Sequence, residues 1–310
     1  MDFGKARSKS EMMKNKKLGR FTWFDGLNTV LMVFLCMIML YPMLYIIGRS
    51  FMNPIEKAEH VLRVIPRKPV LEAYNYIFTR SSFIVSGMKS SVIITVLGTA
   101  LNMLATAPMA YVLSKREYPM RNLITALVVF TMWFGGGMIP NYILVKSLGL
   151  IDTYWALWLP GLISSWNMLV LRNFFQMIPK ELEESAKIDG ANEIRIFVRI
   201  ILPLSTASIA SISLFYAVGH WNSWFNSMIY INSNYKLPLQ NHLRRVLNSI
   251  SALNSDGAAM GNDALTIARI PTADILQYAC IVVTVLPIIV VYPFLQKYFV
   301  KGVMAGSLKG

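Results

Sequence analysis

The chain has 310 residues, of which 55% are hydrophobic and only 15% are charged, whereas a soluble domain is usually about 25% charged. This composition excludes an ordinary soluble helical bundle, whose helices need polar faces. The formal net charge of +14 would suit nucleic-acid binding, but Lys and Arg clusters beside apolar segments also orient membrane proteins. We therefore expect an all-α integral membrane protein without a nucleic-acid partner.

Six segments are apolar over about the 20 residues that a helix needs to cross a bilayer. The first is too long for a signal-peptide core and precedes no small-residue cleavage site, so we interpret it as a retained span. We expect one transmembrane domain at 27–300, after a basic segment at 1–26 and before a tail at 301–310. The predicted spans are residues 27–48, 88–113, 123–145, 154–175, 203–231 and 275–296.

The basic residues around the first span predict its orientation. Seven of them precede it, which places the N-terminus in the cytoplasm. Six spans then return the C-terminus to the cytoplasm. The first outer loop also carries basic residues, so the prediction depends on the N-terminal cluster of Lys5, Arg7, Lys9, Lys14, Lys16, Lys17 and Arg20.

Glycines interrupt the third predicted span. Gly135, Gly136 and Gly137 come shortly before Pro140. Broken helices are tolerated in membranes where the backbone lines a cavity or packs on a neighbour. We expect close packing or a kink near the outer face.

Residues 179–203 predict a helix–glycine–helix elbow on the cytoplasmic face. Pro179 suits the first position of a helix, and the acidic residues that follow suit its first turn. Gly190 is a natural terminator, and Asn192 can cap a second helix. An apolar stripe is expected on that second helix, formed by Ile194, Phe197, Val198 and Ile201.

The order of residues in this elbow resembles the EAA signature of ABC-importer permeases. The matching residues are Glu184, Ser185 and Ala186, then Asp189, Gly190 and Ala191, then Phe197 and Ile200–Pro203. Ser185 replaces the middle alanine, and Ala207 stands where a second proline is common. In that family the short helix seats in a cleft of a separate ATPase subunit. The resemblance thus implies that residues 184–186 and 189–191 couple this chain to an ATPase.

The resemblance extends over nearly the whole chain. The segments 134–153, 159–175, 220–231 and 236–245 are similar to carbohydrate permeases of the MalG and LplC type. This implies a type I ABC-importer permease fold with six transmembrane helices in a bacterial cell membrane. It also implies a homologous second permease, two ABC ATPase subunits that hold ATP and Mg²⁺, and an extracellular solute-binding protein. The tail would contact the ATPase through Gly302, Gly306, Lys309 and Gly310, although its composition alone suits a frayed terminus.

Polar and aromatic residues inside predicted spans are candidates for a sugar path, because rings stack on sugars and amides bond their hydroxyls. Tryptophan also forms interfacial belts, and Asn also joins helices. Asn102 lies in the second span. The remaining candidates are His220, Trp221, Asn222, Trp224 and Asn226 in the fifth span, with Trp158 and Asn167 in the fourth.

The motifs of an enzyme are missing from the sequence. It contains no phosphate-binding loop, no Gly-x-Ser-x-Gly nucleophile elbow, and only three scattered histidines without metal-ligand spacing. We expect a non-enzymatic transport subunit that binds no cofactor or metal. An importer for a non-sugar solute and an ion-driven secondary transporter are the alternatives, and the EAA-like elbow favours the importer.

Overall fold

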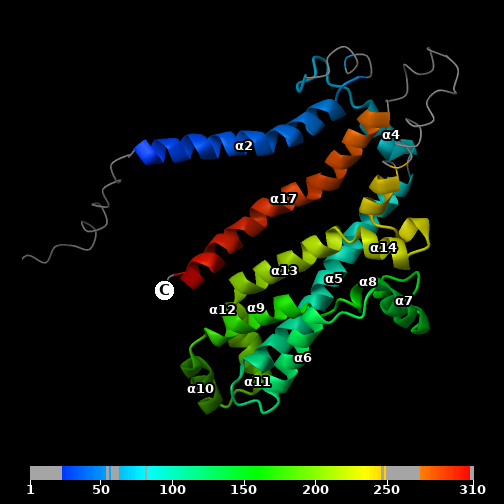
Figure 1. Ribbon diagram of the computed structural model, residues 1–310. Coiled ribbons are helices and arrows are strands. Elements are labelled where there is room, and N and C mark those ends of the chain that lie inside the picture. The colour runs from blue at the N-terminus through cyan, green and yellow to red at the C-terminus, as the bar shows by residue number, and fades with distance from the viewer. Residues whose placement is uncertain are drawn as a thin grey trace, which may run out of the picture.

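The computed structural model describes residues 23–53, 56, 63–80, 82–245, 248 and 273–307. Within these ranges the regular elements are helices (Figure 1). In chain order they are α2 (Trp23–Ser50), α4 (Glu72–Arg80), α5 (Ser82–Ser114), α6 (Arg121–Trp133), α7 (Met138–Ser147), α8 (Trp155–Trp158), α9 (Ser165–Gln176), α10 (Lys180–Ile188), α11 (Glu193–Ile196), the π-helix η1 (Phe197–Ile201), α12 (Leu202–Leu204), α13 (Thr206–Trp221), α14 (Trp224–Tyr230), the 3₁₀ turn η2 (Asn234–Lys236) and α17 (Ala273–Ser307).

Three helices are long and apolar enough to cross a membrane by themselves, namely α2, α5 and α17. They coincide with the first, second and sixth predicted segments. Two further pairs of helices pass the same test only if each bent pair counts as one span, which makes up to five in the described residues. Six continuous spanning helices, as the sequence predicted, are not present in these residues.

The third predicted segment is divided into α6 and α7, whose axes differ by 116°. The break falls on the three glycines, and Gly137 has φ +82°, a left-handed conformation that glycine adopts without steric cost. The predicted interruption is therefore confirmed as a sharp bend. A methyl group added at Gly135 or Gly137 would meet nothing within 4 Å, so close packing within this chain does not explain these glycines.

The fourth predicted segment is not one helix, and this expectation was wrong. It consists of the four-residue α8 and the twelve-residue α9, separated at Pro160–Gly161, where proline cannot donate a helical hydrogen bond. Asn102 of α5 compensates for the break, because its side-chain nitrogen donates to the carbonyls of Gly161 and Leu162 at 2.9 and 2.7 Å. Both carbonyls are thereby satisfied inside the protein.

The fifth predicted segment is also interrupted. The helices before and after Ser205 are bent by 83°, and a second break at Asn222 and Ser223 separates α13 from α14. The sequence pattern predicted one helix over 203–231 because the apolar character is continuous. Hydropathy does not report where the backbone bends.

The centre of the fold is α5, which lies alongside α13 and also packs against α9 (Figure 1). A buried hydrogen bond of 2.8 Å joins the hydroxyl groups of Thr106 on α5 and Tyr216 on α13. The largest apolar cluster surrounds it and includes side chains from α9, α11 and η1. Its buried members are Ala107, Ala110, Tyr111, Leu113, Met168, Leu171, Phe175, Ile196, Ile201, Ile212 and Tyr216.

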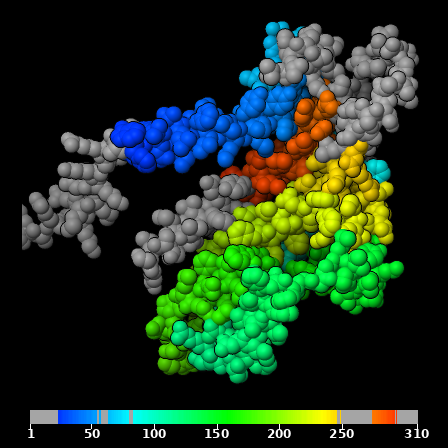
Figure 2. All heavy atoms as spheres, in the orientation of Figure 1, coloured from blue at the N-terminus to red at the C-terminus, as the bar shows by residue number. Residues whose placement is uncertain are grey.

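In contrast, α2 is almost uncovered. Its buried residues are only Gly48, Arg49 and Ser50 at the C-terminal end, and it packs against α17. Figure 2 shows its N-terminal part projecting from the body of the molecule. An apolar helix exposed over this length needs lipid or another protein around it.

Candidate functional site

The helix α10 is the short helix that the sequence predicted at residues 180–190. It begins directly after Pro179, one position later than expected, and Glu181 and Glu183 lie in its first turn, where the free N–H groups favour anions. Gly190 follows its end with φ +78°, a conformation that strains any residue with a Cβ atom. The predicted helix and its glycine terminator are thus confirmed.

The second half of the elbow begins at Asn192, as predicted. The side-chain oxygen of Asn192 accepts a hydrogen bond of 2.8 Å from the backbone N–H of Arg195 and so caps α11. After four residues, α11 changes into the π-helical turn η1. The backbone N–H of Leu202 then bonds the carbonyl of Phe197, five residues back.

The predicted apolar stripe on this second helix is not a single buried face. Ile201 is fully buried, but Ile194 is 75% exposed and Val198 is 51% exposed. The π-helical turn widens the helix, so positions spaced for an α-helix rotate away from one another. Ile196 takes the second buried position instead.

The residues predicted to couple to an ATPase divide between two faces. Ala186 and Ala191 are half-buried and pack against the large apolar cluster. The other four are exposed, namely Glu184, Ser185, Asp189 and Gly190. The elbow is therefore held to the body by its small residues and presents its polar ones outward.

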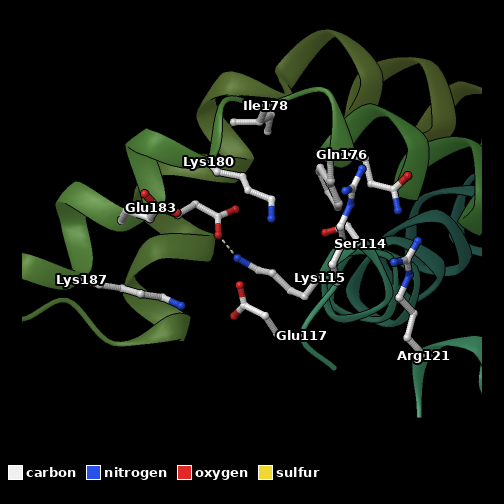
Figure 3. A pocket seen from close by; sticks show the side chains of 12 residues that line it. Ser114, Lys115, Glu117, Arg121, Gln176, Ile178, Lys180, Glu183 and Lys187 are labelled. Atoms are coloured by element: carbon white, nitrogen blue, oxygen red, sulfur yellow. Dashed lines mark hydrogen bonds and ion pairs between the residues drawn. The ribbon is translucent and has the colours of Figure 1, made fainter. Parts of the chain in front are cut away.

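Ionic contacts join α10 to the end of α5 (Figure 3). The amine of Lys115, directly after α5, forms a close ion pair with Glu183 of α10 and lies 3.8 Å from a carboxylate oxygen of Glu193. Lys187 pairs with the other oxygen of Glu193 at 2.7 Å, and this hydrogen bond raises the pKa of Lys187. Partial burial lowers the pKa of Lys115, and the Glu193 carboxylate opposes that shift.

Tyr111 anchors this ionic group to the core. Its ring lies 4.3 Å from the Lys115 amine, a cation–π distance, and its hydroxyl donates to Glu193 at 3.0 Å. Tyr111 is 5% exposed and packs in the core against Phe175 and Phe197.

A cavity of about 160 Å³ lies between α10 and the ends of α5, α6 and α9. Figure 3 shows the side chains of Lys115, Glu117, Lys180, Glu183 and Lys187 converging on one side of it. Five basic and three acidic residues line it: Lys115, Arg116, Arg121, Lys180 and Lys187, with Glu117, Glu183 and Glu184.

The residues proposed for a sugar path lie mainly around the junction of α13 and α14. His220 is half-buried and its Nε2 lies 2.5 Å from the side-chain oxygen of Asn102, which ties α13 to α5. Asn222 and Asn226 are exposed, and Trp224 is half-buried.

The other candidates are buried inside the chain. The indole N–H of Trp158 donates to the carbonyl of Ile94 at 3.2 Å, and Trp158 and Trp221 are 6% and 7% exposed. Asn167 is buried in the first turn of α9. Of these three side chains, Trp158 packs between helices, and Trp221 and Asn167 are buried, whereas Asn222 and Asn226 are exposed.

The predicted ATPase-contacting tail lies partly within α17. The helix continues through Ser307 and includes Gly302 and Gly306, so the backbone is helical where the sequence pattern indicated an aperiodic end. Lys309 and Gly310 lie outside the described residues.

Comparison with known proteins identifies the family. The family described as "Binding-protein-dependent transport system inner membrane component" matches residues 23–305. The chain belongs to this family. Its apolar helices are therefore those of an inner membrane protein, and the family itself is one of transport permeases without enzymatic activity of their own.

Individual relatives match nearly the whole length of this inner membrane component. Protein LplC of Bacillus subtilis (strain 168) is 48% identical over 300 residues, which are 96% of this chain and 98% of LplC. The polygalacturonan/rhamnogalacturonan transport system permease protein YtcP of the same organism is 44% identical and covers 93% of this chain and 98% of its own. A chain from the crystal structure of a bacterial ABC transporter involved in the import of the acidic polysaccharide alginate has a TM-score of 0.79 and 26% identity, with 96% of this chain and all of that chain covered.

The structure of this inner membrane component also shows site residues that sequence reasoning missed. Ile188 at the end of α10 is 87% exposed and Leu182 is 43% exposed, so α10 presents apolar as well as polar groups. The ionic role of Lys115 was missed because its partners are distant in sequence. The sequence did contain a signal for Ile188, because it is an apolar residue at the end of a charged helix. No feature of the sequence marked Lys115.

A second polar cluster lies at the other end of the molecule, beside α14 (Figure 1). Asp152, with φ +62°, accepts a hydrogen bond from the hydroxyl of Ser233 at 2.5 Å. It also accepts hydrogen bonds from the backbone N–H groups of Ser233 and Asn232 at 2.9 and 3.0 Å and forms an ion pair with Lys236 at 3.2 Å. Burial raises the pKa of Asp152, but these hydrogen bonds outweigh it and bring the pKa to about 2. The cluster joins the loop after α7 to the loop after α14.

Proposed function

We propose that this inner membrane component is a permease subunit of an ABC importer that translocates a sugar or oligosaccharide. An extracellular binding protein delivers the solute, and ATP hydrolysis on a separate ATPase drives its passage. The observation that carries the proposal is the match over residues 23–305 to the binding-protein-dependent family, together with an exposed α10. The relatives supply the solute class, since their names include polygalacturonan, rhamnogalacturonan and arabinooligosaccharides.

The proposed coupling site is the exposed side of α10 with its flanking turn. Ile188 gives this surface an apolar anchor of the kind that dominates protein interfaces, and Glu184 and Asp189 surround it with charge. Ser185 and Gly190 are small enough to let a partner approach closely. In the proposal the ATPase holds this surface and moves it, and ATP and Mg²⁺ are bound by the ATPase rather than by this chain.

We propose that this chain crosses the membrane six times beside a second, homologous permease, and that two ATPase subunits lie on the cytoplasmic side of both. The broken segments 123–145, 154–175 and 203–231 then cross the membrane as bent or interrupted helices, which is tolerated where protein or a cavity surrounds the break. A partner permease also supplies cover for the exposed apolar side chains of α2. The solute passes between the two permeases by alternating access, and the polar residues Asn222 and Asn226 are proposed to face its path.

The test is affinity purification of the tagged chain from membranes that contain the whole transport system. We expect an ATPase subunit to accompany the natural chain and to be lost from the variant Glu184→Lys with Ile188→Asp, because an exposed apolar anchor and a negative charge are both removed from the proposed interface. Leu148→Asp is the control, since Leu148 is an exposed apolar residue in the loop between α7 and α8. Absence of any ATPase from the natural chain in mild detergent would reject the importer and favour an ion-driven transporter.

A further inference from the structure

Beside the apolar packing of Ala186, charged side chains connect α10 to the end of α5. No residue of α10 is fully buried, and the cavity of about 160 Å³ lies between α10 and the ends of α5, α6 and α9. Lys115 and Glu183 cross this space, although they are 68 residues apart in sequence. Their side chains are only 21% and 17% exposed.

This ionic group connects α10 to a helix that the chain itself does not join to it. Along the backbone, α10 leads through α11, η1 and α12 into α13. The contact of Lys115 with Glu183 and Glu193 adds a direct connection to α5, the central helix of the fold. Tyr111 of α5 also donates a hydrogen bond to Glu193 of α11. The elbow that carries α10 and α11 is therefore fixed to the same core as α5.

We propose that Lys115 is a positioning residue that transmits the displacement of α10 to α5, so that ATP hydrolysis moves the membrane helices. This inference rests on the proposed function. A half-buried charged hydrogen bond resists separation more than a solvent-exposed ion pair does. When the ATPase displaces α10, α5 therefore follows it, and α13 follows through both its own connection and its packing on α5.

The charged nature of this joint suits a moving contact. Ion pairs retain attraction over several ångströms because the Coulomb energy falls only as the inverse of distance, whereas dispersion contacts are lost within about 1 Å. Lys115 has two carboxylates within reach, Glu183 and Glu193. The amine can therefore shift from Glu183 of α10 to Glu193 of α11 while α10 moves, and the connection to α5 persists because Lys187 of α10 is itself paired with Glu193.

The experiment uses the complete importer, purified with its ATPase and reconstituted into vesicles, and measures ATP hydrolysis and solute uptake in the same preparation. For Lys115→Met we expect the ATPase to remain bound and to hydrolyse ATP, while the uptake per ATP hydrolysed falls by about tenfold, a typical loss of coupling. Lys115→Arg, which keeps the charge, restores most of the uptake. A merely structural role would lower hydrolysis and uptake together.

The control is Arg116→Met, because Arg116 is the adjacent basic residue, is exposed, and forms no ion pair in the described part of the chain. If Lys115→Met folds poorly, the double variant Lys115→Glu with Glu183→Lys reverses the pair and is expected to recover uptake relative to Lys115→Glu alone. Unchanged uptake per ATP in Lys115→Met, or an equal loss in Arg116→Met, overturns the inference. Failure of the natural chain to retain any ATPase rejects the proposed function instead, which distinguishes the two results.

Discussion

At the scale of single residues, Asn102 explains how an interrupted membrane segment stays satisfied. Its amide nitrogen bonds two carbonyls freed by the break before α9, and its oxygen meets His220 of α13. Gly98, one turn earlier on α5, makes room for this arrangement, because a Cβ atom there would lie 2.7 Å from Nε2 of His220. Asn in a membrane segment was recognisable from the sequence as helix glue or path lining, but its partners were not.

Asn102→Leu is accordingly expected to destabilise the fold. It leaves the carbonyls of Gly161 and Leu162 without donors, and each buried unpaired group costs about 1 to 3 kcal/mol. The measurement is the thermal unfolding midpoint of the purified protein in detergent, with the exposed Asn226→Leu as control. An unchanged midpoint for Asn102→Leu would show that these hydrogen bonds are not needed for the fold.

At the scale of elements, helix ends and breaks were predictable where a special residue marks them. Gly190, Asn192 and Gly137 each carry a local requirement that the structure confirms. The break in the fifth segment was missed because uniform apolar character conceals it, whereas the break in the fourth segment falls at Pro160–Gly161, a pair that does signal the end of a helix. The π-helical turn η1 was also unpredictable, since it changes the register of the buried residues without changing the sequence pattern.

The clamp formed by Asp152 between two loops yields a pH prediction. The pKa of Asp152 is lowered from 3.8 to about 2 in the folded chain. The stabilisation from its ionised form is therefore complete above pH 4 and is lost as the pH falls toward 2. Asp152→Asn is expected to lower the unfolding midpoint at pH 7 and to leave it less dependent on pH between about 4 and 2.

The measurement is a series of unfolding curves in detergent for both proteins at these pH values. Asp189→Asn, a change of the same kind at an exposed position directly after α10, serves as a comparison for general effects of charge loss. Parallel pH profiles for the natural chain and Asp152→Asn would contradict the role given to this carboxylate.

At the scale of the whole molecule, the arrangement of the ends supports the proposed orientation. The N-terminal end of α2 and the C-terminal end of α17 lie toward the same end of the molecule as α10 (Figure 1). If α10 meets an ATPase in the cytoplasm, both ends of the chain then face the cytoplasm. The N-terminal basic cluster predicts the same side by the positive-inside rule.

Reporter fusions test this orientation. We expect green fluorescent protein fused after Gly310 to be fluorescent, because it folds in the cytoplasm and not when exported unfolded. Alkaline phosphatase fused after Arg245, beyond α14, is expected to be active, because it requires an oxidising compartment. Active phosphatase at the C-terminus would reverse the proposed orientation.

The sequence alone determined that the protein is helical and lies in a membrane, because long apolar segments have no other stable location. It also determined the short helix at 180–188, because Pro179 and Gly190 mark its ends locally. The order and spacing of the residues in the elbow pointed to the protein's family. Only the tertiary structure decided which residues meet across the fold: Lys115 with Glu183, Asn102 with the break before α9, and Asp152 with the loop at 232–236. Such contacts depend on how helices distant in sequence are packed, and neither hydropathy nor local propensity contains that information.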